Sequence, residues 1–230
     1  MCKKGCSLIL LSGGTGTRMN NNTPKQYMQL CGKPIIMHIL ERVDDIANID
    51  EIIIVCKEEY REIIFNYINN YHLTKNYRFA SSGNTRQESV YNGLKVSTFN
   101  TVIIHEAARP FVKKEEFAEL LNTSEFNVTY GSPINYTVLT CLNNFIDGIL
   151  DRDKLVNIQL PQKFDKELLF QAHIKAKNDD LKFTEDASLL FHYTKEKIAV
   201  IRGKDYNIKI TTPEDIIIAE KIYNEYFIGR

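Results

Sequence analysis

The sequence predicts an α/β fold with one doubly wound, mostly parallel sheet and an attached β-hairpin arm. Strand-length apolar runs alternate with amphipathic helical segments through the first half of the chain, which is typical of right-handed βαβ units. The run at 51–56 is nearly continuous in apolar residues, as expected for a parallel strand buried on both faces. Residues 1–230 are therefore expected to form a single domain, with the arm at about 134–164.

The first half of the chain supplies most of this sheet. An apolar strand at 8–11 ends in a glycine-rich turn, and Pro34 opens a helix as its first residue. Apolar residues then recur at helical spacing from Ile35 to Val43. The further elements expected here are strands at 51–56, 77–80 and 101–105 and helices at 58–71 and 88–96.

The second half interrupts the alternation. Two short strand-like runs, at 137–141 and 148–150, are joined by the polar turn Asn143-Asn144, which predicts the hairpin of the arm. A terminal helix starts at Thr212, because a threonine cap followed by proline and two acids suits a helix N-terminus. The other elements expected are strands at 127–133 and 197–202 and helices at 115–122, 166–177 and 186–193.

Composition limits the functions that are open to the chain. Its 29 basic and 29 acidic side chains give no net charge, so no global field favours nucleic acid. The five cysteines show no paired spacing, which favours reduced thiols in the cytoplasm over a disulfide framework. No run approaches the roughly 20 apolar residues of a membrane helix, and the run at 8–11 is too short for a signal peptide. We expect a cytoplasmic protein without nucleic-acid or membrane partners.

The turn after the first strand is the main candidate for a binding site. It reads Ser12-Gly13-Gly14-Thr15-Gly16, and glycine allows several backbone N–H groups to converge on one phosphate oxygen. Arg18 and Lys25 add two positive charges beside it. The turn lacks the Gly-Lys-Ser/Thr of a Walker loop, and Met19 replaces the third glycine of the dinucleotide fingerprint. By itself it is equally typical of an unspecific strand-to-helix connection.

A wider resemblance gives this turn a function. Leu11–Met19 together with Pro24-Lys25-Gln26-Tyr27 resembles the signature of nucleotidyltransferases that form CDP-alcohols, namely the methylerythritol-phosphate and ribitol-phosphate cytidylyltransferases. Similar motifs follow in the family's order at 83–95, 105–111, 184–189 and 207–215. The resemblance spans nearly the whole chain. It implies a Rossmann-like fold, Mg²⁺ as cofactor, and transfer of CMP from CTP to a small polyol phosphate with release of pyrophosphate.

The same resemblance assigns roles to individual residues. Catalysis falls to Arg18, Lys25 and Lys209. The residues implied in CTP binding are Ser12, Gly13, Gly14, Thr15, Gly16, Gly83, Asn84 and Ser89. The residues implied in acceptor binding are Glu106, Arg109, Thr137 and Arg152. Thr137 and Arg152 would come from the arm of the neighbouring subunit in a homodimer. The Mg²⁺ ion would be held mainly by the CTP phosphates, with Glu106 as a candidate protein ligand.

Three residues depart from the family pattern: Asn84 bears on recognition of the base, and Glu106 and Leu160 bear on the acceptor. Asn84 and Glu106 stand where the families usually have aspartate, and Leu160 stands where both usually have threonine. The leading acceptor is 2-C-methyl-D-erythritol 4-phosphate, an isoprenoid precursor, and ribitol 5-phosphate or a related polyol phosphate is the alternative. A purine- or UTP-using nucleotidyltransferase lacks support from the 83–89 segment. A catalytically silent nucleotide-binding module is a different class, and the retained cations speak against it.

Three further residues have predicted environments. Lys209 sits between two apolar residues in a strand-like stretch, where an unpaired ammonium would be costly, so we expect an anionic partner. His105 ends a buried strand and is expected to be a satisfied core histidine, since an ionised acceptor phosphate needs no general base. Arg86 either anchors the 83–89 turn or reaches a phosphate, and the sequence leaves both open.

Overall fold

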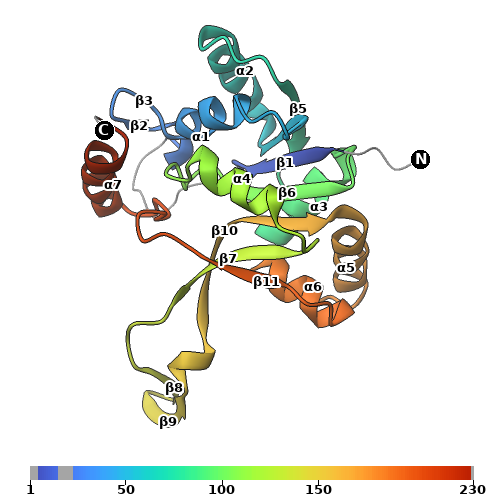
Figure 1. Cartoon of the computed structure of the whole chain (residues 1–230), viewed down its shortest axis with the longest axis vertical. Helices are drawn as coiled ribbons and strands as arrows, with labels where there is room; N and C mark the ends of the chain where they lie inside the picture. Colours follow the sequence, from blue (N-terminus) through green and yellow to red (C-terminus); the bar gives the residue numbers. More distant parts are fainter. Residues whose placement is uncertain (1–4, 15–22, 229–230) are drawn as a thin grey trace.

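A seven-stranded sheet in the order β11-β7-β10-β6-β1-β4-β5 forms the centre of the molecule (Figure 1). The computed structural model describes residues 5–14 and 23–228. The strands are β1 (Cys6–Leu11), β4 (Glu51–Cys56), β5 (Asn76–Ser81), β6 (Thr101–Glu106), β7 (Val128–Pro133), β10 (Val156–Asp165) and β11 (Ala199–Arg202). Of these, β10 runs antiparallel to both of its neighbours, whereas every other pairing within the sheet is parallel. The predicted mostly parallel sheet is confirmed.

Helices cover both faces of this sheet, as a doubly wound fold requires. One face carries α1 (Ile35–Asp44), α2 (Arg61–Asn70) and α4 (Lys114–Asn122), and the other carries α3 (Arg86–Val96), α5 (Lys166–Asn178) and α6 (Asp186–Thr194). Successive strand residues point to opposite faces, so Leu8 and Leu10 join the first core while Ile9 joins the second. Because both faces are covered, the strands read as continuous apolar runs.

A smaller cluster attaches the C-terminal helix. α7 (Pro213–Tyr226) packs beside the short hairpin of β2 (Gln29–Leu30) and β3 (Lys33–Pro34), and Leu30, Phe111 and Ala219 are buried there. Thr212 caps α7 in a capping box with Asp215, as the sequence predicts. Pro34 differs from its prediction by one position, because it precedes α1 as the cap residue and belongs to β3.

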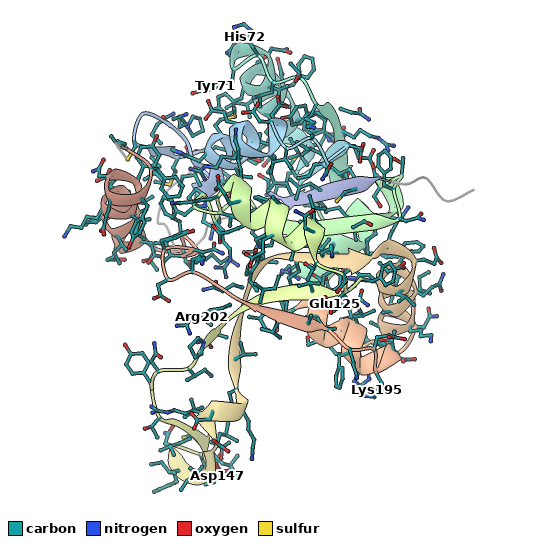
Figure 2. All side chains as sticks on the ribbon, viewed as in Figure 1. Tyr71, His72, Glu125, Asp147, Lys195 and Arg202 are labelled. Carbon is teal, nitrogen blue, oxygen red and sulfur yellow. The ribbon has the colours of Figure 1, made fainter. Side chains whose placement is uncertain are left out.

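The hairpin expected in the second half is present. β8 (Val138–Leu142) and β9 (Phe145–Leu150) pair antiparallel, and both residues of the Asn143-Asn144 turn have positive φ, which asparagine tolerates better than most residues. The hairpin projects away from the sheet, with Asp147 at its tip (Figure 2). A short helical turn, η4 (Arg152–Lys154), leads back from it.

The strand β10 was not predicted, and its presence shortens the range of residues that form the arm. Its residues Gln162–Asp165 pair with β6 inside the central sheet, although the prediction placed 134–164 in the arm. We therefore use the term arm for residues 134–155. The other predicted strands and helices are present with ends shifted by a few residues. Within the described ranges, no helix is long and apolar enough to cross a membrane.

Candidate active site

A cavity of about 490 Å³ opens at the carboxyl ends of β1, β4, β5 and β6. The strand order reverses here, since β4 and β5 lie on one side of β1 and β6 lies on the other, and doubly wound folds bind ligands at such a point. The predicted site residues that line the cavity are Ser12, Gly13, Gly14, Lys25, Gly83, Asn84, Ser89, Glu106 and Lys209. Arg18, Thr15 and Gly16 lie outside the described residues.

The glycine turn and the segment that carries Lys25 form one wall. The side-chain amide of Gln26 donates to the carbonyl oxygens of Ser12 (2.7 Å) and Gly14 (3.0 Å). The Ser12 hydroxyl lies 3.2 Å from the Tyr27 hydroxyl. These bonds tie η2 (Lys25–Tyr27) to the end of β1, so Lys25 is held against the turn and is only 9% exposed. The backbone of Lys25 is thus fixed beside the glycine turn.

The neighbouring wall is the turn between β5 and α3. A side chain at Gly13 would place its Cβ 2.3 Å from Ser82 Cβ, so glycine is what allows the two turns to approach each other. The turn itself is fixed from within, because the Ser89 hydroxyl accepts from Gly83 N (3.0 Å) and donates to Thr85 O (2.9 Å). Asn84 remains exposed at the cavity. The Ser89 hydroxyl therefore holds the turn in shape.

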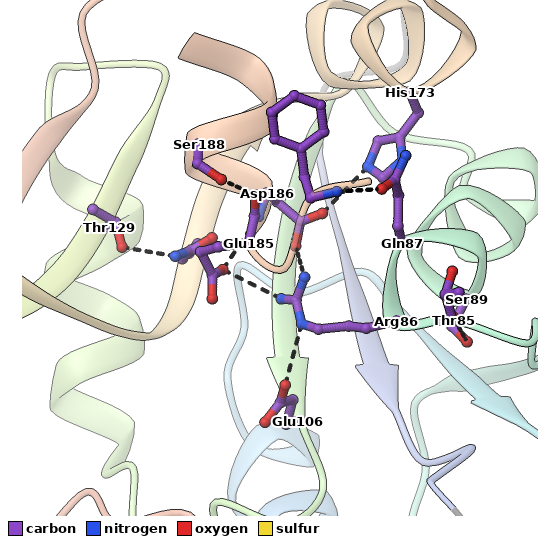
Figure 3. Close-up of polar contacts among 12 residues, drawn as sticks. Thr85, Arg86, Gln87, Ser89, Glu106, Thr129, His173, Glu185, Asp186 and Ser188 are labelled. Atoms are coloured by element: carbon purple, nitrogen blue, oxygen red, sulfur yellow. Dashed lines mark hydrogen bonds and ion pairs between the residues drawn. The ribbon is translucent and has the colours of Figure 1, made fainter. Parts of the chain in front are cut away.

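Glu106 lies at the end of β6 between two cations (Figure 3 shows the Arg86 side). Arg86 Nε is 3.2 Å from Glu106 Oε1, and Lys209 Nζ is 2.7 Å from Glu106 Oε2. Burial opposes ionisation of this carboxyl, but the charges of Lys209 and Arg86 outweigh it and lower the pKa of Glu106 to about 2. Glu106 is therefore an ionised carboxylate that can only accept hydrogen bonds.

Arg86 connects Glu106 to the start of α6. Its Nη1 lies 2.7 Å from Asp186 Oδ2 and its Nη2 lies 3.3 Å from Glu185 Oε1, while His173 Nε2 is 3.2 Å from the other oxygen of Asp186 (Figure 3). The sequence left the role of Arg86 open between anchoring and phosphate binding. The structure places its guanidinium among three carboxylates.

Lys209 reaches the cavity from an irregular segment, and the strand-like environment predicted for it is wrong. Ile210 N donates to Ala108 O (2.8 Å), and Arg109 Nη1 donates to Asn207 O (3.0 Å), which fixes the segment beside β6. The predicted need of Lys209 for an anionic partner is confirmed by Glu106. Arg109 does not line the cavity, and its Nε is 3.8 Å from Glu106 Oε2.

Two residues for which the sequence made predictions, His105 and Leu160, are buried near the cavity. His105 is fully buried in the core, as the sequence predicts, but it is only half satisfied: its Nε2 is 3.0 Å from Arg109 O, whereas its Nδ1 has no hydrogen-bond partner among the described residues. Burial lowers the pKa of His105 to about 4. Leu160 is also buried, does not line the cavity, and its carbonyl oxygen accepts from Asn207 Nδ2 (2.6 Å).

Thr137 and Arg152 are not brought to the cavity by this chain. Both belong to the arm, which extends away from the sheet, and Arg152 Nη1 donates to Asn135 O (2.9 Å) within the arm. The cavity also has cationic and polar lining residues that the sequence analysis missed, among them Lys57 and Thr211. The signal for Lys57 was its place directly after an apolar strand, at the sheet edge where ligands bind.

The described residues contain no cluster of side chains suited to a metal ion. No three histidine, cysteine, aspartate or glutamate side chains among them are grouped so that they could hold a metal ion. Glu106, the one candidate ligand from the sequence, already pairs with Arg86 and Lys209. Protein ligands within the described ranges therefore do not form a metal site of their own.

A cation-lined cavity beside a glycine turn, at the switch point of a doubly wound sheet, defines a nucleotide-binding α/β protein. The chain belongs to the 2-C-methyl-D-erythritol 4-phosphate cytidylyltransferase (IspD) family, whose model matches residues 6–225. The resemblance seen in the sequence is thus confirmed, and with it the class of enzyme, a cytidylyltransferase.

Individual relatives and structures agree with this assignment. A chloroplastic 2-C-methyl-D-erythritol 4-phosphate cytidylyltransferase of Oryza sativa is 35% identical over 97% of this chain and 76% of its own. The enzyme of that name from Chlamydia trachomatis is 35% identical over 96% of each chain. Among solved structures, the 4-diphosphocytidyl-2C-methyl-D-erythritol synthase of Anaerococcus prevotii superposes with a TM-score of 0.83 at 32% identity, covering 95% of this chain and 97% of that one.

Proposed function

We propose that this protein transfers CMP from CTP to 2-C-methyl-D-erythritol 4-phosphate and releases pyrophosphate, a step of isoprenoid precursor synthesis. The observation that carries the proposal is a single cavity lined by the glycine turn and Lys25 together with the Glu106–Lys209 pair. The first part suits a triphosphate and the second suits a phosphorylated polyol. The name of the matched family specifies 2-C-methyl-D-erythritol 4-phosphate and the transfer of a cytidylyl group.

The reaction joins two polyanions, so positioning and charge neutralisation account for most of the catalysis. An oxygen of the acceptor phosphate attacks the α-phosphorus of CTP, and the bond from that phosphorus to the bridging oxygen of the β-phosphate breaks. We assign Lys25 to the charge that develops on the α-phosphoryl oxygens, because the hydrogen bonds of Gln26 hold it beside the glycine turn. Arg18 is proposed as a second cation on the triphosphate.

The CTP end of the cavity is assigned to the two turns. Gly13 and Gly14 present backbone to the phosphates, and the Gly83–Asn84 turn, fixed by Ser89, faces the base. An asparagine side chain has both an amide donor and a carbonyl acceptor, so it can pair with the hydrogen-bonding edge of cytosine. A bound Mg²⁺ would neutralise phosphate charge, and since Glu106 is already paired with two cations, the triphosphate oxygens would be its main ligands.

The acceptor end is assigned to Glu106 and Lys209. An ionised carboxylate accepts hydrogen bonds, so Glu106 suits the hydroxyl groups of a polyol, and the ammonium of Lys209 suits its phosphate. Arg109 would act on the acceptor by holding the segment that carries Lys209. The acceptor phosphate arrives ionised, so its oxygen attacks without a general base.

We further propose that the protein works as a homodimer through the arm. The arm exposes large apolar side chains, including Phe145 (76%), Ile146 (70%) and Ile149 (83%). An isolated two-stranded hairpin is marginally stable in water, so a partner that covers these side chains is needed. The partner's arm would bring Thr137 and Arg152 to the acceptor end. The four described cysteines are free thiols, which supports a cytoplasmic location.

Ribitol 5-phosphate remains the second candidate acceptor, on the evidence of Glu106. Glutamate is one methylene longer than the aspartate usual at this position, so its carboxylate extends further toward the acceptor. Leu160 is weaker evidence for ribitol 5-phosphate than Glu106, because it is buried and does not line the cavity. Pyrophosphate release with CTP and each polyol phosphate tests both. Turnover with the methylerythritol phosphate supports the proposal, and turnover with ribitol 5-phosphate alone overturns it.

A further inference from the structure

We infer that Arg86 is a positioning residue that acts through Glu106 and links the turn facing CTP to the acceptor end of the cavity. The inference rests on the proposed function, because it names a residue that serves the acceptor site of that reaction. Arg86 is the first residue of α3, and its side chain reaches across the cavity lining to Glu106 at the end of β6.

The contacts of Arg86 define this role. Each of its three guanidinium nitrogens has a carboxylate partner: Nε with Glu106 (3.2 Å), Nη1 with Asp186 (2.7 Å) and Nη2 with Glu185 (3.3 Å). Asp186 is 1% exposed and is held from behind by His173. Arg86 is thus fixed to the start of α6 by a buried ion pair, and it presents its remaining nitrogen to Glu106 (Figure 3).

These contacts argue against direct phosphate binding by Arg86. A phosphate that took the guanidinium would have to displace at least one carboxylate, and losing Arg86 would leave Asp186 as a buried charge with only His173 beside it. Leaving a buried charge uncompensated is strongly unfavourable. Lys209 is more exposed than Arg86, and Glu106 is the one carboxylate within 4 Å of it among the described residues. Lys209 can therefore turn towards an acceptor phosphate.

The position of Arg86 in the chain supplies the link to CTP. Arg86 is the first residue of α3, directly after the cap residue Thr85 and two residues after Asn84. The Glu88 carboxylate and the Ser89 hydroxyl bind the backbone of Asn84 and Gly83, so the turn and the first turn of α3 form one hydrogen-bonded unit. A ligand that orders this unit also orders the backbone from which Arg86 reaches Glu106.

Arg86→Lys tests the inference, because lysine keeps the charge but cannot contact three carboxylates in one plane. Steady-state kinetics should show the acceptor KM raised, with a loss of up to about 100-fold in kcat/KM for the acceptor, as expected for a displaced binding group. The KM for CTP should stay unchanged. Arg78→Lys is the matched control, since Arg78 also pairs with a 1% exposed carboxylate, Glu51, at the opposite edge of the sheet. It should lower the melting temperature and leave both KM values as they were.

A double-mutant cycle separates positioning from mere packing. If Arg86 acts through Glu106, the Arg86→Lys/Glu106→Gln double variant should have nearly the same kcat/KM for the acceptor as the Glu106→Gln single variant. If Arg86→Lys fails to fold, Asp186→Asn is the second test, because it keeps Arg86 but removes its shortest ion pair. This variant should also raise the acceptor KM.

The outcomes are distinguishable. A parent protein without turnover overturns the proposed function. An active parent whose Arg86→Lys variant keeps both KM values, loses CTP affinity alone, or shows fully additive losses with Glu106→Gln overturns this inference and leaves the proposed function standing.

Discussion

Lys209 Nζ lies 2.7 Å from Glu106 Oε2, which joins the segment after β11 to the carboxyl end of β6. The pair sets the charge of the proposed acceptor end of the cavity. It keeps Glu106 ionised, and it holds a partly exposed ammonium at the cavity.

The Lys209→Met variant should therefore lose acceptor binding. A hydrogen bond to a charged group contributes roughly 1.5–3 kcal/mol, so we expect kcat/KM for the acceptor to fall about 10- to 100-fold with little change in the KM for CTP. Steady-state kinetics measures this, with Lys204→Met as the control, because Lys204 is exposed and does not line the cavity. A loss of CTP affinity instead would move Lys209 to the nucleotide end.

The Lys25→Ala variant should lose turnover more than CTP affinity. Its charge is assigned to the transition state, and removing one such group typically costs about 100- to 1,000-fold in kcat. Single-turnover rates and CTP binding by calorimetry separate the two effects. Lys33→Ala is the control, since Lys33 pairs with Glu41 outside the cavity lining. Intact turnover at saturating CTP would make Lys25 a simple binding residue.

Buried histidines should weaken the protein on mild acidification. Burial lowers the pKa of both His38 and His105 to about 4, whereas an unfolded histidine titrates near 6.5. Between these values the unfolded chain binds more protons, so stability falls as the pH drops from 6.5 to 4. Each histidine contributes a slope of up to about 1.4 kcal/mol per pH unit. Urea unfolding from pH 7 to 5 should show a shallower decline for His38→Gln than for the parent; equal slopes would contradict the assignment.

The arm should complete the acceptor site of a partner chain. Arg152→Ala and Lys25→Ala proteins, each inactive alone, should regain part of the activity when co-expressed, because one hybrid site then contains both residues. The Lys25→Ala/Arg152→Ala double variant co-expressed with Lys25→Ala is the control and should stay inactive. A fully active monomer in solution would exclude a shared site.

The central sheet could be predicted because its strands are buried on both faces and read as continuous apolar runs. β10 could not, because it carries polar residues in buried positions. Gln162 donates to Thr129 Oγ1 (2.9 Å) and Lys163 donates to Thr123 O (3.0 Å), and such long-range partners leave no local pattern. The polar turn of the hairpin could be recognised in the sequence. The residue at which the arm ends and the chain re-enters the sheet could not.

The site was predictable where its residues adjoin recognisable motifs. The glycine turn, Lys25, the 83–89 turn and Glu106 all line one cavity. The role of Arg86 was hidden, because its partners Glu106, Glu185 and Asp186 meet it only once α3, β6 and α6 pack together. Lys209 was assigned by the family resemblance, and its apolar neighbours predicted an anionic partner, yet its irregular backbone depends on contacts with Ala108 and Arg109.

The central claim is tested most directly by pyrophosphate release with CTP, UTP, ATP and GTP, each combined with 2-C-methyl-D-erythritol 4-phosphate or ribitol 5-phosphate in the presence of Mg²⁺. The account predicts release with CTP and the methylerythritol phosphate, and far slower release with the other seven combinations. Absence of turnover with CTP and the methylerythritol phosphate, or equal turnover with all four nucleotides, would contradict it.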